Sequence, residues 1–285
     1  LLVVNIFPSA TGKRKELESI LNQTCKIAYK KHIKLSKKGA LNYMFQLYKG
    51  EQWAGNWNNN FAGFREKMSY CFTNDKEMTI YLIELKDKSI AVDIKERIRS
   101  LYGIGNHSIH INDTHEETLR LSRCLLNKNS VHFLNNSDVK NYSKFYNSLR
   151  YYEQYIDKNG LDQEKYCLTA SGVLSLYGLR EAADVDYIHD CEHEISDPTD
   201  NIHSHNVYGV GIYKKSYHEI IYNPDNHFYF GNIKVASLDV IKELKEYRNE
   251  DKDRVDVSLI ESIKQPSRIF AGSHGAFGES RASER

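Results

Sequence analysis

The sequence has no long hydrophobic run, and this absence excludes a helix that crosses a membrane. Such a helix needs roughly 20 consecutive apolar residues, and no segment of the 285 residues approaches that length. Hydrophobic residues make up 40% of the chain and charged residues 27%, a composition typical of a globular protein. The chain is long enough for two domains, which is what we expect.

The chain also lacks an excess of charge of either sign. Its 39 Lys and Arg residues are balanced by 38 Asp and Glu residues, and the formal net charge is +1. A chain with this balance has no overall field that would gather polyanions. The charge therefore disfavours a general nucleic-acid coat protein, and phosphate binding has to come from local groups.

Paired cysteines and the common nucleotide and hydrolase motifs are missing as well. The five cysteines have no Cys-x-x-Cys spacing, and the sequence contains no GxGxxG, Walker, HExxH or GxSxG motif. Scattered cysteines, odd in number, favour free thiols in a reducing cytoplasm over a disulfide framework. They are Cys25, Cys71, Cys124, Cys167 and Cys191.

The first half of the chain alternates strand-like and helix-like segments. Apolar runs predict the strands, and apolar residues at helical spacing predict the helices between them. The expected strands cover residues 2–7, 78–85 and 108–112, and the expected helices cover residues 12–31, 64–71, 90–101 and 114–126. This order suits an open sheet with helices on one face.

The second half begins after a polar stretch at residues 135–143, where the apolar periodicity is lost. The expected elements are a Tyr-rich helix, a strand at residues 185–188, apolar segments at 166–178, 207–213 and 227–235, and helices at 238–248 and 255–263. We predict an α+β protein with two domains and a flexible tail. Their bounds are 1–137, 138–268 and, for the tail, 269–285.

Asp184 and Asp186 flank one apolar residue, Val185. On a strand, alternation points both carboxylates to the same side, a few ångströms apart. Two carboxylates so close repel each other unless a cation lies between them. Mg²⁺ suits such a site because it takes a few carboxylates together with phosphate oxygens of a substrate. The pattern predicts two metal ligands; the alternative is a solvated pair on an edge strand.

Ser171 and Gly172 stand upstream of these aspartates, where a helix is expected to begin. The free N–H groups of a helix start can bind a phosphate, and small residues let the phosphate approach closely. Arg180 follows this helix and is placed to neutralise a phosphate through its fork of donors. We therefore predict that Ser171, Gly172 and Arg180 bind a nucleotide.

Residues 165–263 resemble the nucleotidyltransferase superfamily typified by polymerase beta. That family has Gly-Ser or Gly-Gly, a short helix, and then Asp-apolar-Asp; Ser171 matches the Ser, and Ala170 stands in the usual Gly position. The runs at 230–237, which contains Lys234, and at 252–256 (Lys-Asp-Arg-Val-Asp) also resemble the ends of small family members. The resemblance implies that Asp184 and Asp186 bind metal and that Ser171 and Lys234 contact the nucleotide.

The resemblance also implies a third carboxylate from a later strand, for which Glu219 is the first candidate and Asp225 the second. The implied activity is metal-dependent transfer of a nucleoside monophosphate from an NTP substrate, with Mg²⁺ or Mn²⁺ and release of pyrophosphate. The acceptor stays open: a sugar phosphate, a protein and an RNA end all suit the same residues.

Residues 105–117 (Gly-Asn-His-Ser-Ile-His-Ile-Asn-Asp-Thr-His-Glu-Glu) resemble the active-site stretch of nucleoside diphosphate kinases. His110 falls on that family's phosphorylated histidine, and Phe7 stands where the family has a Lys before its Pro. The resemblance covers residues 1–126. It implies a ferredoxin-like scaffold and a homo-oligomer formed through the N-terminal domain.

Two further functions stay open beside nucleotidyl transfer. One is a phosphotransferase that works through phosphohistidine at His110, since a neutral imidazole accepts a phosphoryl group well. The other is a nucleotide-binding or assembly module in which both sites are inert. A zinc site among the His and Cys residues of 189–205 is a weaker expectation, with a polar loop as its alternative.

Overall fold

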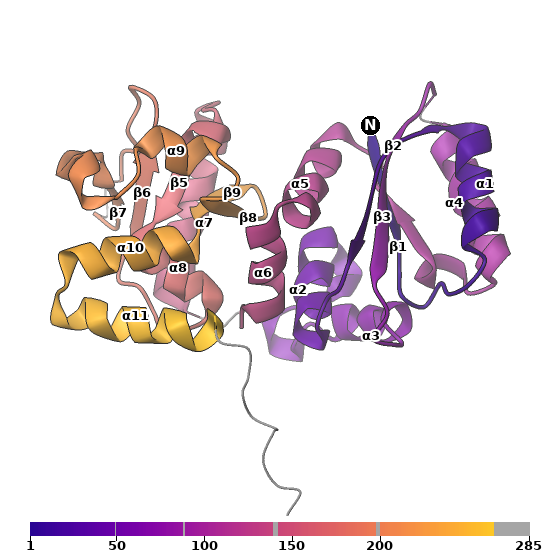
Figure 1. Ribbon diagram of the computed structural model, residues 1–285, viewed down its shortest axis with the longest axis horizontal. Helices are drawn as coiled ribbons and strands as arrows, with labels where there is room; N and C mark the ends of the chain where they lie inside the picture. Colours follow the sequence, from indigo (N-terminus) through magenta and orange to yellow (C-terminus); the bar gives the residue numbers. More distant parts are fainter. Residues whose placement is uncertain (49, 88, 139–141, 198–199, 265–285) are drawn as a thin grey trace, which may run out of the picture.

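The computed structural model describes residues 1–48, 50–87, 89–138, 142–197 and 200–264. These residues form two β-sheets covered by helices, an architecture compatible with the α+β class (Figure 1). None of the helices in these ranges combines the length and the apolar character that a bilayer crossing requires. The predicted tail at 269–285 lies outside the described residues.

The first sheet has the strand order β2-β3-β1-β4, and all its neighbours are antiparallel. Its strands are β1 (Leu2–Ile6), β2 (Lys26–Ile33), β3 (Met78–Glu84) and β4 (Ile109–Ile111). Val4 of the central strand lies opposite Tyr81 on one side and Ile111 on the other. The helices of this half are α1 (Arg14–Thr24), α2 (Lys37–Leu47), α3 (Ala62–Cys71), α4 (Ile90–Tyr102), α5 (His115–Leu126) and α6 (Lys128–Asn136).

Helices cover both faces of this sheet, so the prediction of helices on one face was wrong. Leu2, Val4 and Ile6 pack with residues of α1 and α4, whereas Val3 and Phe7 pack with residues of α2, α3 and α5. Every residue of β1 is buried. An unbroken apolar strand needs cover on both sides, and Figure 1 shows β1 and β3 between the two groups of helices.

The predicted helix at residues 12–31 ends early, because residues 26–33 form strand β2. This strand lies at the edge of the sheet, and only Ile33 is fully buried within it. Lysines are common on edge strands, where they discourage pairing with another chain. Residues 26–31 of this lysine-rich strand were thus mistaken for the end of a helix.

The second sheet has the strand order β7-β6-β5-β9-β8. Its strands are β5 (Tyr166–Thr169), β6 (Val185–His189), β7 (Ile202–Ser204), β8 (His227–Phe230) and β9 (Ile233–Ala236). Strand β5 pairs antiparallel with β6 and parallel with β9, while β6 pairs parallel with β7. The sheet is therefore mixed. The predicted strand at 185–188 is present, and β7 was missed.

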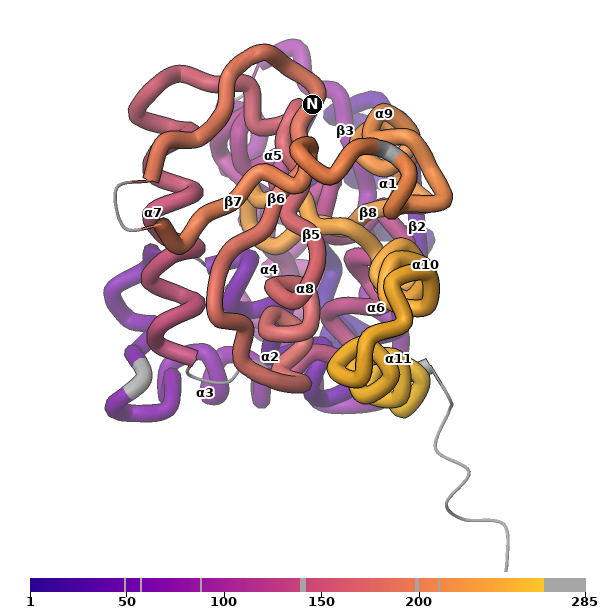
Figure 2. The backbone as a smooth tube through the Cα atoms, turned by 90° about the vertical axis from the view of Figure 1, so that its left-hand side faces the viewer, coloured from indigo at the N-terminus to yellow at the C-terminus, as the bar shows by residue number. Residues whose placement is uncertain are grey.

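The helices of this half are α7 (Ser143–Lys158), α8 (Ala170–Tyr177), α9 (Tyr217–Tyr222), α10 (Leu238–Arg248) and α11 (Asp251–Lys264). Figure 2 shows β5, β6 and β7 side by side, with α7 to the left and α10 and α11 to the right. Buried residues of these elements form one core, in which Phe145, Val173 and Tyr187 are at most 1% exposed.

Helix α6 connects the two sheets through packing and hydrogen bonds. Phe133 of α6 stacks on Phe228 of β8 with ring centroids 4.7 Å apart. Just before the helix, the side chain of Asn127 donates to the carbonyl oxygens of Pro224 and His227. These contacts fix the β8–β9 hairpin against the first half of the chain.

Candidate active site

Strands β6 and β7 bring Asp184, Asp186 and His203 together. Asp186 lies opposite His203 in the parallel β6–β7 pair, and Asp184 stands just before β6. One ligand atom from each of the three side chains lies within 4.8 Å of the other two. The two carboxylates therefore point to the same side, as strand alternation predicts.

His203 supplies a donor that the sequence analysis had placed in a possible zinc site and not beside Asp184 and Asp186. Its Nδ1 lies 3.6 Å from Asp184 Oδ2 and 3.9 Å from Asp186 Oδ1. Two oxygens and one imidazole nitrogen suit a divalent cation, and the nitrogen shifts the preference from Mg²⁺ toward Mn²⁺ and related metals. The pattern Ile202-His203-Ser204-His205 could have indicated a strand with both histidines on one face, because its histidines alternate with other residues.

Neither predicted third carboxylate joins this group. Glu219 lies on α9, not on a strand, and its carboxylate accepts hydrogen bonds from the backbone N–H and the hydroxyl of Ser216. These bonds lower the pKa of Glu219 below its usual value. Asp225 is paired with Lys128 at 2.9 Å. The side chain that the structure brings to Asp184 and Asp186 is instead His203, and Glu219 and Asp225 each have another partner.

A chain of polar contacts fixes the orientation of Asp186. His205 Nε2 lies 3.3 Å from Asp186 Oδ1, and His205 Nδ1 lies 2.9 Å from the Tyr213 hydroxyl. That hydroxyl also contacts the Thr169 hydroxyl at 3.0 Å. Burial raises the pKa of Tyr213, so it stays a hydroxyl donor. His205 thus links Asp186 to the hydroxyls of Tyr213 and Thr169.

Helix α8 begins beside Asp186. Thr169, the last residue of β5, lies opposite Asp186, and Ser171 stands in the first turn of α8. Ala170 between them has φ +49°, in the left-handed region that favours glycine. Gly172 faces the core: a Cβ there would lie 3.1 Å from Phe145 and Leu168 side-chain atoms. Its missing side chain is explained by packing, whereas Ser171 is partly exposed.

Arg180 is not a free cation. Its guanidinium binds both carboxylate oxygens of Asp256, at 2.6 and 2.8 Å. Asp256 also pairs with the buried Lys245 at 2.8 Å, and Lys245 reaches Asp253 at 3.0 Å. Burial by itself would raise the pKa of Asp256, but the bonds from Arg180 and Lys245 lower it. Arg248 closes the network on Asp253 at 2.6 Å.

Lys234, the other predicted phosphate contact, is also engaged elsewhere. Its side chain is 2% exposed and lies 2.9 Å from Glu164 Oε2, while its ammonium donates to the Glu164 carbonyl oxygen at 2.6 Å. The same ammonium lies over the rings of Tyr222 and Tyr229. These contacts belong to the packing between the halves, because Glu164 also binds Arg123 of α5 at 2.7 Å.

His110 lines a second polar site, a cavity of about 660 Å³ next to β4. Lys67 and Arg99 line the same cavity, and Tyr48 packs edge-on against the His110 ring. His110 Nε2, His107 Nδ1 and Arg99 Nε are buried without a hydrogen-bond partner in the described part of the chain. Burial, with a smaller effect of Lys95, lowers the pKa of His110 to about 4.

The expected zinc cluster is not assembled in the described ranges, where Asp184, Asp186 and His203 are the one group of at least three such side chains that converges. His189 instead contacts the carbonyl oxygen of Cys191 and the hydroxyl of Ser204. His193 Nε2 lies 3.4 Å from the Tyr155 hydroxyl. His193 follows the polar-loop alternative, whereas His189 is the last residue of β6.

No family model matches the sequence, and no curated protein matches it either. Among solved structures, the chain is similar to the nucleoside diphosphate kinase of Aquifex aeolicus, with 15% identity and a TM-score of 0.30. The match covers 41% of this chain and 88% of that chain. A similarity this weak does not establish a family.

Proposed function

We propose that the protein is a metal-dependent nucleotidyltransferase. The observation that carries this proposal is the convergence of Asp184, Asp186 and His203 beside the start of α8. Two carboxylates and an imidazole form a donor set for a divalent cation, and the adjoining helix start offers N–H groups to a phosphate. Among the described residues no other such donor group occurs.

In this proposal an acceptor oxygen forms a bond to the α-phosphorus of an NTP while the bond to the bridging oxygen of pyrophosphate breaks. A bound Mn²⁺ or Mg²⁺ would neutralise the charge that develops on the phosphates. Asp184, Asp186 and His203 would hold the cation, and His205 keeps Asp186 in place. Ser171 and the first N–H groups of α8 would hold the terminal phosphates. Arg180, whose guanidinium is fixed by Asp256, would help to neutralise the phosphate charge.

Transfer from α-labelled NTP tests this proposal directly. With Mn²⁺ present and sugar phosphates, RNA and the protein itself as acceptors, wild type is expected to move label and release pyrophosphate. Asp184→Asn with Asp186→Asn is expected to lower the rate by at least about 10³-fold, because the cation site is lost. Asp190→Asn, which removes an exposed carboxylate just after β6, is the matched control. Full activity in the double variant would remove the proposal.

A second candidate, phosphotransfer through His110, is favoured because His110 lines a cavity with Lys67 and Arg99 and its buried Nε2 has no hydrogen-bond partner in the described residues. The low pKa keeps this imidazole neutral and nucleophilic at pH 7. Incubation with γ-labelled ATP separates it from the first candidate. An acid-labile label that disappears in His110→Gln supports phosphohistidine, and label in that variant rejects it. Tight nucleotide binding with no turnover by either route identifies an inert module.

The fold observations support the finer architecture within this proposal. The order β2-β3-β1-β4, with connections through α1 and α4, supports a ferredoxin-like scaffold for residues 1–137. The mixed second sheet supports a separate nucleotidyltransferase-like domain from residue 138. Self-association through the N-terminal domain belongs to the same proposal. The five free cysteines favour a reducing compartment, for which we propose the cytoplasm.

A further inference from the structure

A cavity of about 440 Å³ lies between the two halves, away from both polar sites. Phe45 and Gln46 of α2 form one wall, α7 forms the opposite wall, and the β8–β9 hairpin closes the space between them. In the second sheet, β5 and β9 separate β8 from the β6 strand that carries Asp186. The cavity is therefore a different place from the carboxylate group.

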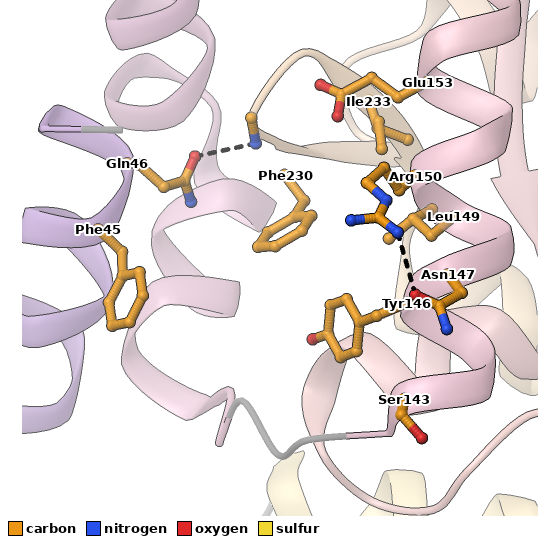
Figure 3. A pocket seen from close by; sticks show the side chains of 11 residues that line it. Phe45, Gln46, Ser143, Tyr146, Asn147, Leu149, Arg150, Glu153, Phe230 and Ile233 are labelled. Atoms are coloured by element: carbon orange, nitrogen blue, oxygen red, sulfur yellow. Dashed lines mark hydrogen bonds between the residues drawn. The ribbon is translucent and has the colours of Figure 1, made fainter. Parts of the chain in front are cut away.

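Three aromatic rings from three elements surround this space. Figure 3 shows the rings of Phe45, Tyr146 and Phe230 facing it from α2, α7 and the end of β8. Ring faces and edges in one small cavity favour a flat aromatic ligand, because offset and edge-on contacts add to the burial of apolar surface. The volume is in the lower part of the roughly 300–1,000 Å³ range of small-molecule sites. It suits a small ring system.

The donors of the cavity are the Tyr146 hydroxyl and the Arg150 guanidinium, and the lining also includes one carboxylate, that of Glu153. The Tyr146 hydroxyl is buried and has no hydrogen-bond partner in the described ranges, and burial raises its pKa so that it keeps its proton. Arg150 lies one turn further along α7 and contacts Asn147 Oδ1 at 3.3 Å. No carboxylate of the described chain forms an ion pair with Arg150. Figure 3 shows both side chains directed from α7 toward the same space.

We propose that this cavity binds a small planar aromatic molecule with one anionic group. The aromatic part would lie among Phe45, Tyr146 and Phe230, and the anionic group would accept from Arg150 and from the Tyr146 hydroxyl. Charge-assisted hydrogen bonds of a guanidinium are the stronger kind. Such a ligand would contact both halves of the chain, where Gly231 N–H already donates to Gln46 Oε1 at 3.1 Å.

Naphthalene-1-acetate and its uncharged amide, naphthalene-1-acetamide, test the proposal on the wild-type protein by titration calorimetry and ligand-observed NMR. The acid is expected to bind at least about tenfold more tightly than the amide, since only the acid can pair with Arg150. ATP with Mn²⁺ is expected not to displace it. That arm separates this result from the fate of the nucleotidyltransferase proposal. Equal binding of acid and amide, or no binding of either at millimolar concentration, would overturn the inference.

Variants on α7 locate the site. Arg150→Gln is expected to weaken binding of the acid by at least about tenfold and to leave the amide unchanged, and Tyr146→Phe to weaken the acid about three- to tenfold. Lys158→Gln removes an exposed charge from the last turn of the same helix and is expected to change neither. Arg150→Gln with unchanged affinity for the acid would reject the proposed site.

Discussion

At the start of β6, two carboxylates lie together with an imidazole, whereas beside β4 an imidazole shares a cavity with an ammonium and a guanidinium. The first group has unbalanced negative charge and suits a cation. The second has polar nitrogens without partners and suits an anion. A chain with a net charge of +1 can therefore present two strong local fields of opposite sign. Overall charge alone gave no indication of either.

The largest expected effect concerns the buried ion pairs that hold Arg180 close to the carboxylate site. Lys245→Met should destabilise the protein by about 3–5 kcal/mol, because it leaves the buried Asp253 and Asp256 without their shared cation. Lys242→Met on the same helix is the control, with a much smaller change expected from its exposed pairs with Glu246 and Glu261. Denaturant unfolding measures both. Equal effects would contradict the larger cost of leaving the buried carboxylates unpaired.

A pH titration of stability examines the histidine cavity. The pKa of His110 is about 4 in the folded protein and 6.5 as a free group, so the unfolded chain takes up this proton first. The stability that His110 contributes is complete above pH 6.5 and is lost as the pH falls toward 4, by on the order of 3 kcal/mol. His110→Gln should flatten the profile in this window. A variant profile parallel to wild type would contradict the burial of a neutral imidazole.

Mn²⁺ affinity distinguishes the carboxylate site from the His110 cavity. His203→Gln should weaken Mn²⁺ binding about tenfold or more, since even groups behind metal ligands contribute 10–100-fold. His110→Gln should leave it unchanged, because that site attracts anions. Electron paramagnetic resonance of free Mn²⁺ gives both affinities, and His218→Gln on the exposed face of α9 serves as the control. Loss of affinity in His110→Gln would contradict the division of roles.

The smallest effect concerns the backbone that begins α8. Ala170→Gly should stabilise the protein by about 0.5–1 kcal/mol, because glycine adopts φ +49° without the strain of a Cβ. Ala40→Gly, inside α2, should destabilise by about 1 kcal/mol. Thermal unfolding measures both changes in stability. Destabilisation by Ala170→Gly would show that the left-handed turn is not strained.

Sequence patterns succeeded where the deciding contact is local. The helix expected at 114–126 is present as α5, and Thr114 begins it with a capping box to Glu117. The same pattern at Ser216 and Glu219 was overlooked, although Ser-x-x-Glu before apolar residues indicates a helix start. Recognising it would have removed Glu219 from the candidate ligands.

The patterns failed where distant segments meet. Strand β2 carries few buried residues, so its sequence lacks the apolar alternation that marks a half-buried strand. Strand β7 has only the residues 202–204, and it places His203 beside Asp186 through pairing with β6. Arg180 was predicted to neutralise a phosphate, and its binding to Asp256 could not be foreseen because it depends on α11 packing against α10.

The sequence by itself determined that Asp184 and Asp186 project together, because alternation along a strand is a property of adjacent residues. It also determined the apolar strands and most helices of both halves. Only the tertiary structure decided which third side chain joins the two carboxylates and which cations are already neutralised. Those outcomes depend on strand pairing and helix packing between residues far apart in the chain, which no local spacing specifies.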